Sequence, residues 1–124
     1  MSTWAQAIER IAVSDDLHIA PLRANGVTYG TPTWIWSVVV ADRLYVRAWN
    51  GKRSRWYGSA MTQRVGRIIA SGETHEVKFF AADPALNDRI DDAYRTKYAG
   101  SPYLPTMVAS GPREATVEIV PRKE

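Results

Sequence analysis

Basic and aromatic residues dominate one short part of the chain, and their chemistry is that of anion binding. Residues 43–72 contain seven of the sixteen Lys and Arg residues and none of the thirteen Asp and Glu residues. Protein surfaces usually mix the two signs of charge, so a one-sided segment produces a positive potential that attracts anions. Trp34, Trp36, Trp49 and Trp56 lie in or just before this segment. We therefore expect it to bind a negatively charged ligand.

The densest charge lies where a strand should give way to a helix. Ser54 is suited to cap that helix. Its apolar face would consist of Trp56, Tyr57, Ala60, Met61 and Val65. A helix start has unpaired N–H groups and a partial positive charge. Lys52, Arg53 and Arg55 would each cost an isolated helix about 0.3–1 kcal/mol at this end, and a bound phosphate would offset that cost.

The residues around this helix start could converge on one phosphoryl group. Arg47 ends the preceding strand, and its guanidinium can donate hydrogen bonds to phosphate oxygens together with Lys52 and Arg53. The Ser54 hydroxyl and the first N–H groups of the helix add further donors. Gly51 would let the backbone approach the anion closely.

Two other interpretations of the basic segment remain open. Its long side chains could cover Trp49 and Trp56 with their stems, or pair with acidic residues of a helix predicted over 84–98. Arginines interleaved with tryptophans could also stack nucleic-acid bases. Because Trp34 and Trp36 share one face of a strand, at least one of them fits a core position better than a stacking platform. We expect no nucleic-acid partner.

No other group of residues identifies a catalytic centre. His18 lacks a partner acid at a spacing that defines a dyad, and His75 fits a solvated position at the shoulder of a hairpin. Asp91 and Asp92 are adjacent on the predicted helix, so their side chains diverge. The sequence has no cysteine, and two histidines are a small supply of metal ligands. We assign no catalytic residue and expect no metal.

The basic segment must be positioned by the helices and strands around it. Thr3 opens a capping-box pattern at the start of a short amphipathic helix over 4–12. Asp83 and Pro84 suit the cap and first turn of the helix over 84–98. Strands are predicted over 17–23, 33–40, 44–49, 67–71, 75–81 and 114–120, from their β-branched and aromatic content or their alternating polarity.

Six strands with about three helices indicate a mainly β member of the α+β class. So many strands with so few covering helices would leave open sheet edges, and closure into a barrel removes them. We predict a six-stranded antiparallel barrel in a single domain over 1–124. No apolar run is long enough to cross a bilayer, and the first ten residues lack the pattern of a signal peptide. We expect a cytoplasmic protein with no membrane partner.

The order of these elements resembles the flavin-binding split β-barrel superfamily, which includes pyridoxamine phosphate oxidase-like and deazaflavin-dependent nitroreductase-like proteins. The resemblance covers roughly residues 17–120 and is clearest in GTPTWIWSVVVADRLYVRAWNGKRSRWY. Residues 32–36 match the alternating strand of that superfamily, Arg47 its strand end, and 52–55 the basic helix start that holds the cofactor phosphate. More closely, the blocks HIAPLR, TPTWIW, YVRAWNG and DDAYRTKY resemble an uncharacterised bacterial family within the group.

This resemblance implies a split β-barrel that binds FMN or a deazaflavin and passes a hydride to a small organic substrate. The residues implied to bind the cofactor are Thr33, Trp34, Arg47, Trp49, Asn50, Lys52, Arg53, Ser54, Arg55 and Trp56. Trp49 stands near the strand end, where the superfamily has a small hydroxyl-bearing residue, and its indole could narrow the slot for an isoalloxazine ring. A cofactor-free binding module, or a cofactor-independent enzyme with an anion pocket, is therefore the alternative.

The number of aromatic residues also bears on assembly. Strand alternation must direct some of the tryptophans and tyrosines between 29 and 57 outward, because one small core cannot hold them all. Large aromatic side chains are enriched in buried interfaces. Together with the resemblance, this predicts a homodimer with a ligand cleft between its subunits.

Overall fold

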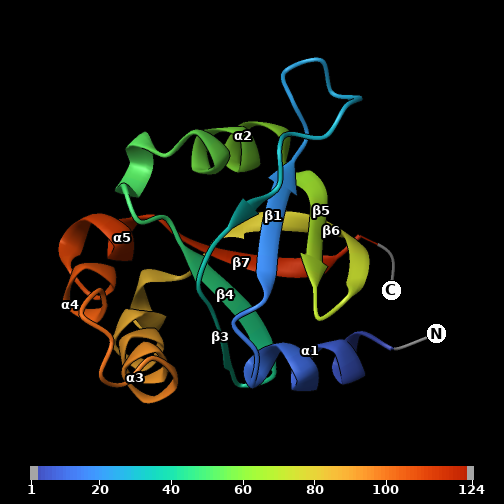
Figure 1. Cartoon of the computed structure of the whole chain (residues 1–124). Coiled ribbons are helices and arrows are strands. Elements are labelled where there is room, and N and C mark those ends of the chain that lie inside the picture. Colours follow the sequence, from blue (N-terminus) through green and yellow to red (C-terminus); the bar gives the residue numbers. More distant parts are fainter. Residues whose placement is uncertain (1–2, 123–124) are drawn as a thin grey trace.

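The computed structural model describes residues 3–122 and combines one antiparallel sheet with helices outside it (Figure 1). The strands are β1 (Leu17–Pro21), β2 (Thr33–Trp34), β3 (Ser37–Val40), β4 (Arg43–Arg47), β5 (Val65–Ala70), β6 (Glu73–Ala81) and β7 (Thr116–Pro121). The α-helices are α1 (Trp4–Ala12), α2 (Arg55–Gln63), α3 (Asn87–Lys97), α4 (Leu104–Met107) and α5 (Ser110–Glu114). Two 3₁₀ turns, η1 (Gly51–Arg53) and η2 (Pro84–Leu86), precede α2 and α3.

The sheet curls because its two edge strands are neighbours in sequence. The strand order is β2-β1-β5-β6-β7-β4-β3, and every pair is antiparallel. β2 and β3 therefore lie at opposite edges, although only Ile35 and Trp36 separate them. Three residue steps reach about 11 Å at most, so the two edges must come together at this point. The result is a half-barrel, and we call the link at Ile35 and Trp36 the seam.

The seam corrects the predicted strand count from six to seven. The sequence indicated one strand over 33–40, whereas the structure divides it between the two edges of the sheet. The Ile35 N–H still donates to the Leu17 carbonyl of β1 (3.1 Å), and Ser37 then pairs with Val46 of β4. Alternation of side chains continues across the division, so the local pattern does not show the change of partner.

Two of the predicted helix starts are confirmed by their caps. In α1 the Thr3 side chain accepts from the Gln6 N–H (3.1 Å), and the Gln6 side chain accepts from the Thr3 N–H (3.0 Å). Asp83 accepts from the Ala85 N–H (2.9 Å) at the turn before α3.

The helix count is corrected from three to five within the described residues, because α4 and α5 were not predicted. These helices have four and five residues and contain Pro105 and Pro112, so they carry neither a helical period nor helix-forming composition. Packing against the rest of the chain must hold them, since isolated helices of this length are unstable. No helix within residues 3–122 is long and apolar enough to span a membrane.

The strands have a separate apolar cluster on each face, as β4 shows. Its Leu44 and Val46 belong to the main core, which α1 and α2 help to cover. Tyr45 faces the other way and packs with Ile90, Tyr94 and Met107 of the helices after β6. We call residues 84–114, which contain α3, α4 and α5, the helical cap. Figure 1 shows these three helices grouped beside β3 and β4.

Gly66 is the tightest point of the sheet. It lies in β5 between Pro21 of β1 and Val77 of β6. A Cβ atom there would come within 2.6 Å of the Pro21 Cα and 2.7 Å of the Ala20 carbonyl oxygen. Both are backbone atoms of the neighbouring strand, so a side chain would force the strands apart.

We therefore expect Gly66→Ala to lower the free energy of unfolding by about 1–3 kcal/mol, as overpacking does in cores. Gly58→Ala is the matched control, because a Cβ at Gly58 in α2 meets no atom within 4 Å. Alanine should raise stability there by about 0.5–1 kcal/mol, since helices disfavour glycine. Urea unfolding measures both changes. Equal stabilities for the two variants would show that the close contact at Gly66 has no energetic consequence.

Candidate functional site

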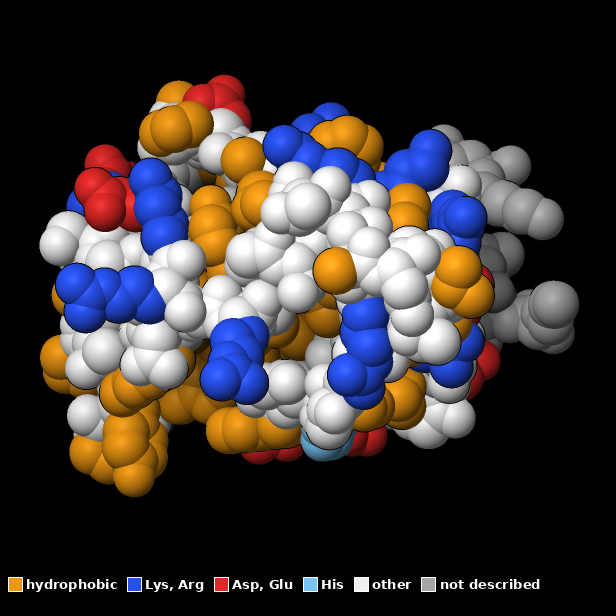
Figure 2. Space-filling model, turned by 90° about the horizontal axis from the view of Figure 1, so that it is seen from above, with side chains coloured by type: hydrophobic (Ala, Val, Ile, Leu, Met, Phe, Trp, Pro, Cys, Tyr) orange, Lys and Arg blue, Asp and Glu red, His pale blue; other side chains and the backbone are white. Residues whose placement is uncertain are grey.

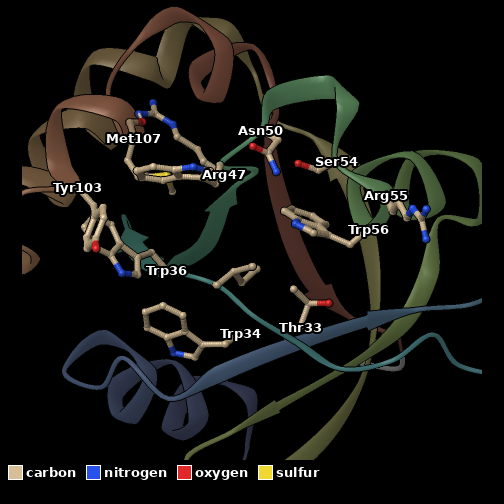
Figure 3. Close-up of a pocket in the computed structure, with 12 residues that line it drawn as sticks. Thr33, Trp34, Trp36, Arg47, Asn50, Ser54, Arg55, Trp56, Tyr103 and Met107 are labelled. Carbon is tan, nitrogen blue, oxygen red and sulfur yellow. Dashed lines mark hydrogen bonds between the residues drawn. The ribbon is translucent and has the colours of Figure 1, made fainter.

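A cavity of about 590 Å³ lies where the seam, the start of α2 and the helical cap meet (Figure 3). Eight of the ten residues predicted for cofactor binding line it, namely Thr33, Trp34, Arg47, Trp49, Asn50, Ser54, Arg55 and Trp56. Lys52 and Arg53 do not line the cavity and are exposed. Four lining residues were not predicted: Ile35, Trp36, Tyr103 and Met107.

The residues that were missed belong to the two features that the sequence did not reveal. Ile35 and Trp36 form the seam, and Tyr103 and Met107 come from the beginning and end of the α4 segment of the cap. Trp36 lies in a recognisable alternating stretch, so its proximity to Trp34 was the available indication. Tyr103 and Met107 are at least 47 residues from the rest of the site along the chain, and only tertiary packing brings them to it.

The end of the cavity near α2 is polar. Ser54 occupies the predicted N-cap position of α2, but its side chain makes no capping hydrogen bond, and neither does Asn50 at the start of η1. Figure 3 shows the Asn50 and Ser54 side chains close to each other beside the Trp56 ring. The first turn of α2 contains no acidic residue. This end therefore combines uncommitted polar side chains with the free N–H groups of a helix start.

Positive charge surrounds the polar end without entering it. No ion pair among residues 3–122 involves Lys52, Arg53 or Arg55. In Figure 3 the Arg55 guanidinium is turned away from Asn50 and Ser54. Figure 2 shows Lys and Arg side chains spread over the face seen from above, with Asp and Glu at its margins. Lys52 and Arg53 thus add to a positive field over this face from outside the cavity, whereas Arg55 lines the cavity with its guanidinium directed away from the polar end.

Arg47 is held differently, because its guanidinium is fully buried beneath the helical cap. Its Nε donates to Thr116 Oγ1 (3.0 Å), and Nη1 donates to Asp91 Oδ1 and to the Met107 carbonyl (3.1 Å). Its Nη2 donates to the carbonyl (3.2 Å) and Oδ1 (3.3 Å) of Asn87. These five bonds use all five guanidinium donors. Arg47 therefore does not converge with Lys52 and Arg53, and the predicted alternative, pairing with an acidic residue of the helix over 84–98, describes it correctly.

The opposite end of the cavity is aromatic. The Trp36 ring stacks on Tyr98, with centroids 3.9 Å apart and planes 4° from parallel. Trp49 meets Tyr103 edge to face at 5.6 Å. Trp34, Trp49 and Tyr103 remain 51%, 43% and 60% exposed, and the Trp34 Nε1 donates to the Asp15 carbonyl (2.7 Å). Broad ring faces are thus presented to the cavity, as in sites that bind flat organic molecules.

Lys97 and Tyr98, at the end of α3, hydrogen-bond to backbone groups next to the seam. Lys97 Nζ donates to the carbonyls of Ile11 (2.9 Å) and Ser37 (2.7 Å). The Tyr98 hydroxyl accepts from the Ser37 N–H (3.1 Å) and donates to the Ser37 carbonyl (3.2 Å). Burial lowers the pKa of Lys97 to about 8, against a smaller opposing effect of Asp15. Burial also raises the pKa of Tyr98.

The lining residues include no Asp, Glu, His, Lys or Cys. In the part of the chain that the structure describes, no three His, Asp or Glu side chains are grouped as metal ligands would be. The cavity walls can therefore bind and orient a ligand, and of the usual general acids and bases they offer the Tyr103 hydroxyl alone.

Comparisons with known proteins give a family and a fold. The sequence profile of a bacterial protein family, described as "Uncharacterized protein conserved in bacteria (DUF2255)", matches residues 7–119. A crystal structure of a conserved hypothetical protein from Mycobacterium tuberculosis is similar, with a TM-score of 0.64 and 14% identity. The similarity covers 99% of this chain and 82% of that one, and at this identity it shows the fold alone. Curated proteins gave no match.

The titration of Lys97 and the buried tyrosines predicts how stability depends on pH. Folded Lys97 loses its proton near pH 8, whereas the unfolded residue keeps it to about 10.5. The unfolded chain therefore binds more protons between these values, and the free energy of unfolding should rise with pH. Above pH 10, unfolded tyrosines ionise first, because burial raises the pKa of Tyr45, Tyr94 and Tyr98, and stability should fall.

Urea unfolding at closely spaced pH values from 7 to 11 would measure this dependence. Lys97→Met is the informative variant, since it should remove the rise below pH 10 and keep the fall above it. A rise of the same size in Lys97→Met would mean that another group causes it.

Proposed function

The chain belongs to the bacterial DUF2255 family, and we propose that it binds FMN or a deazaflavin in the cavity and transfers a hydride to a small organic substrate. The observation that carries this proposal is the division of the cavity into an aromatic end and a polar end beside a helix start. The resemblance of the sequence to flavin-binding split barrels supports it. The bound cofactor would supply the hydride chemistry, and the cavity walls would bind and orient it.

The aromatic end suits the ring system of such a cofactor. Trp36 is held rigidly by its stack on Tyr98, so it offers a fixed ring face at the seam. Trp49 and Tyr103 support each other and leave the cavity open at about 590 Å³. That volume lies within the roughly 300–1,000 Å³ of ordinary small-molecule sites. The Trp49 indole, which the sequence suggested could narrow the ring slot, therefore leaves room for a ligand.

The polar end suits the cofactor phosphate. The Ser54 hydroxyl, the Asn50 amide and the N–H groups of the first turn of α2 would donate to its oxygens. Lys52, Arg53 and Arg55 would attract the anion from outside through their field. A phosphate at this position would also relieve the unfavourable placement of these three charges at a helix start.

A cofactor-free binding module is the second candidate. The absence of Asp, Glu, His, Lys and Cys from the lining residues favours it, because the Tyr103 hydroxyl is then the one common acid or base in the cavity wall. It would hold a flat anionic small molecule with the same residues.

Fluorescence titration separates these candidates. FMN or a reduced deazaflavin should quench the tryptophans saturably, and riboflavin should do so more weakly because it lacks the phosphate. Inorganic phosphate should change the fluorescence much less, since it would lie near Trp56 alone and would not reach the tryptophans at the aromatic end. Hydride transfer is then tested by oxidation of the bound reduced cofactor with small electrophilic acceptors. Failure of every flavin and deazaflavin to bind would exclude the proposed function and leave the binding module.

Ser54→Ala tests the phosphate position. The substitution removes one hydrogen bond to a charged group, so we expect FMN to bind about tenfold more weakly and riboflavin to be unaffected. Ser59→Ala is the matched control, because Ser59 lies on the same helix and does not line the cavity. Equal losses for FMN and riboflavin would place the phosphate elsewhere.

We also propose that the protein forms a homodimer, with partly exposed rings at the cavity mouth as part of the contact. Trp34, Trp49 and Tyr103 form the aromatic surface concerned, and clustered exposed apolar groups are typical of interaction sites. A twofold arrangement would place two equivalent cavities beside the interface.

Sedimentation equilibrium at micromolar concentration should therefore give the mass of two chains. Replacing the exposed Trp34 with Glu should shift the equilibrium toward one chain, because it buries a charge in the contact. Replacing Val13 with Glu serves as the control, because Val13 is exposed at the C-terminal end of α1 and does not line the cavity. A single-chain mass in the presence and absence of FMN would rule out the dimer.

A further inference from the structure

We infer that Arg47 is a positioning residue, which holds the helical cap against the sheet so that Tyr103 and Met107 complete the cavity wall. Although Arg47 lines the cavity, its guanidinium donors are used within the protein, so it would govern ligand affinity by holding the cap and not by donating to the ligand. The inference rests on the proposed function only for the ligand used in one arm of its test.

The hydrogen bonds of Arg47 join elements that are otherwise distant in sequence. From β4, its side chain reaches Asn87 and Asp91 of α3, the carbonyl of Met107 at the end of α4, and Thr116 of β7. Four of the five bonds go to the cap. Arg47 is therefore the polar connection from the sheet to the α4 segment, while Lys97 and Tyr98 connect the end of α3 to Ser37 of β3.

The α4 segment depends on such a connection. A helix of four residues is not stable by itself, and α4 has no side-chain cap at its start. Its first turn begins after Tyr103 and ends at Met107, and both residues line the cavity. The bond from Arg47 to the Met107 carbonyl (3.1 Å) thus fixes the end of the segment that presents the Tyr103 ring to Trp49.

Stability alone does not account for this arrangement. Asp91 is buried and interacts with Arg47 through one carboxylate oxygen and with Arg113 Nε (3.4 Å) through the other. Buried ion pairs can often be replaced by apolar residues of similar volume without loss of stability. An apolar pair, however, cannot fix the directions of five bonds from one strand to three other elements. Fixing those directions is the contribution that only Arg47 makes.

The test replaces the ion pair with apolar residues of similar size, as Arg47→Met with Asp91→Leu. We expect cooperative unfolding to persist, because both buried partners of the Arg47–Asp91 pair are removed together and Arg113 keeps its ion pair with Asp88 (2.9 Å). In the free protein, the amides of Met107, Val108 and Ala109 should exchange with solvent at least about tenfold faster, since the cap loses its directional bonds. FMN affinity should fall about tenfold or more.

The matched control is Arg95→Ala with Asp92→Ala. This exposed pair lies on the same helix α3 and removes the same two charges, but it bonds to no other element of the described structure. Neither amide exchange in α4 nor FMN affinity should change. If the apolar double variant does not fold, Arg47→Lys replaces it, because lysine keeps the charge beside Asp91 but cannot reach Asn87 and Met107 at the same time.

The two readouts keep this inference separate from the proposed function. Unchanged amide exchange in α4 would overturn the role of Arg47, whatever the ligand does. Faster exchange with unchanged FMN affinity would show that the cap does not govern the site, and would also overturn it. If FMN does not bind even the unaltered protein, the proposed function fails, while the exchange measurement still decides whether Arg47 positions α4.

Discussion

The structure depends on one covalent constraint, which is that two residues join the opposite edges of the sheet. Ile35 and Trp36 can span only a short distance, so β2 and β3 draw the seven strands into a half-barrel. The curl separates an inner apolar core from an outer face that needs a second cover, and the helical cap provides it. The cavity lies at the seam because the sheet there has no continuous hydrogen-bonded strand to fill the space.

The sequence predicted what is encoded locally and missed what depends on distant partners. The capping box at Thr3 was recognisable because its hydrogen bonds lie within one turn. The helix start at Ser54 was recognisable from the apolar helical pattern that follows it, although the Ser54 side chain makes no capping hydrogen bond. Most of the candidate site was recognisable for the same reason, since residues 47–56 are consecutive around one strand end. At Trp36 the chain passes from pairing with β1 to pairing with β4, and Tyr103 reaches the cavity from the helical cap. Both features depend on contacts between distant residues, which leave no periodic pattern in the sequence.

Arg47 shows how a correct local observation can support the wrong role. Its position at a strand end beside other basic residues suggested a phosphate ligand. Side chains alternate between the two faces of β4. Leu44 and Val46 point to the core, so Arg47 faces the cap together with Tyr45 and not the predicted phosphate position. The same alternation could be read from the sequence, which also offered the acidic residues of the helix over 84–98 as alternative partners. What the sequence lacked was the knowledge that the cap folds over that face.

The basic segment that first indicated anion binding thus contains basic residues of two kinds, buried and exposed. Arg47 is neutralised and fixed, so it shapes the site, while Lys52 and Arg53 are exposed and unpaired among the described residues. Exposed charges contribute mainly through a field that raises association rates and weakens with salt, whereas short hydrogen bonds in a sheltered cavity determine how long a ligand stays. In the proposed function, attraction and retention of the phosphate would therefore fall to different residues: the surface cations bring the anion to the cavity, and the neutral donors at the start of α2 hold it there.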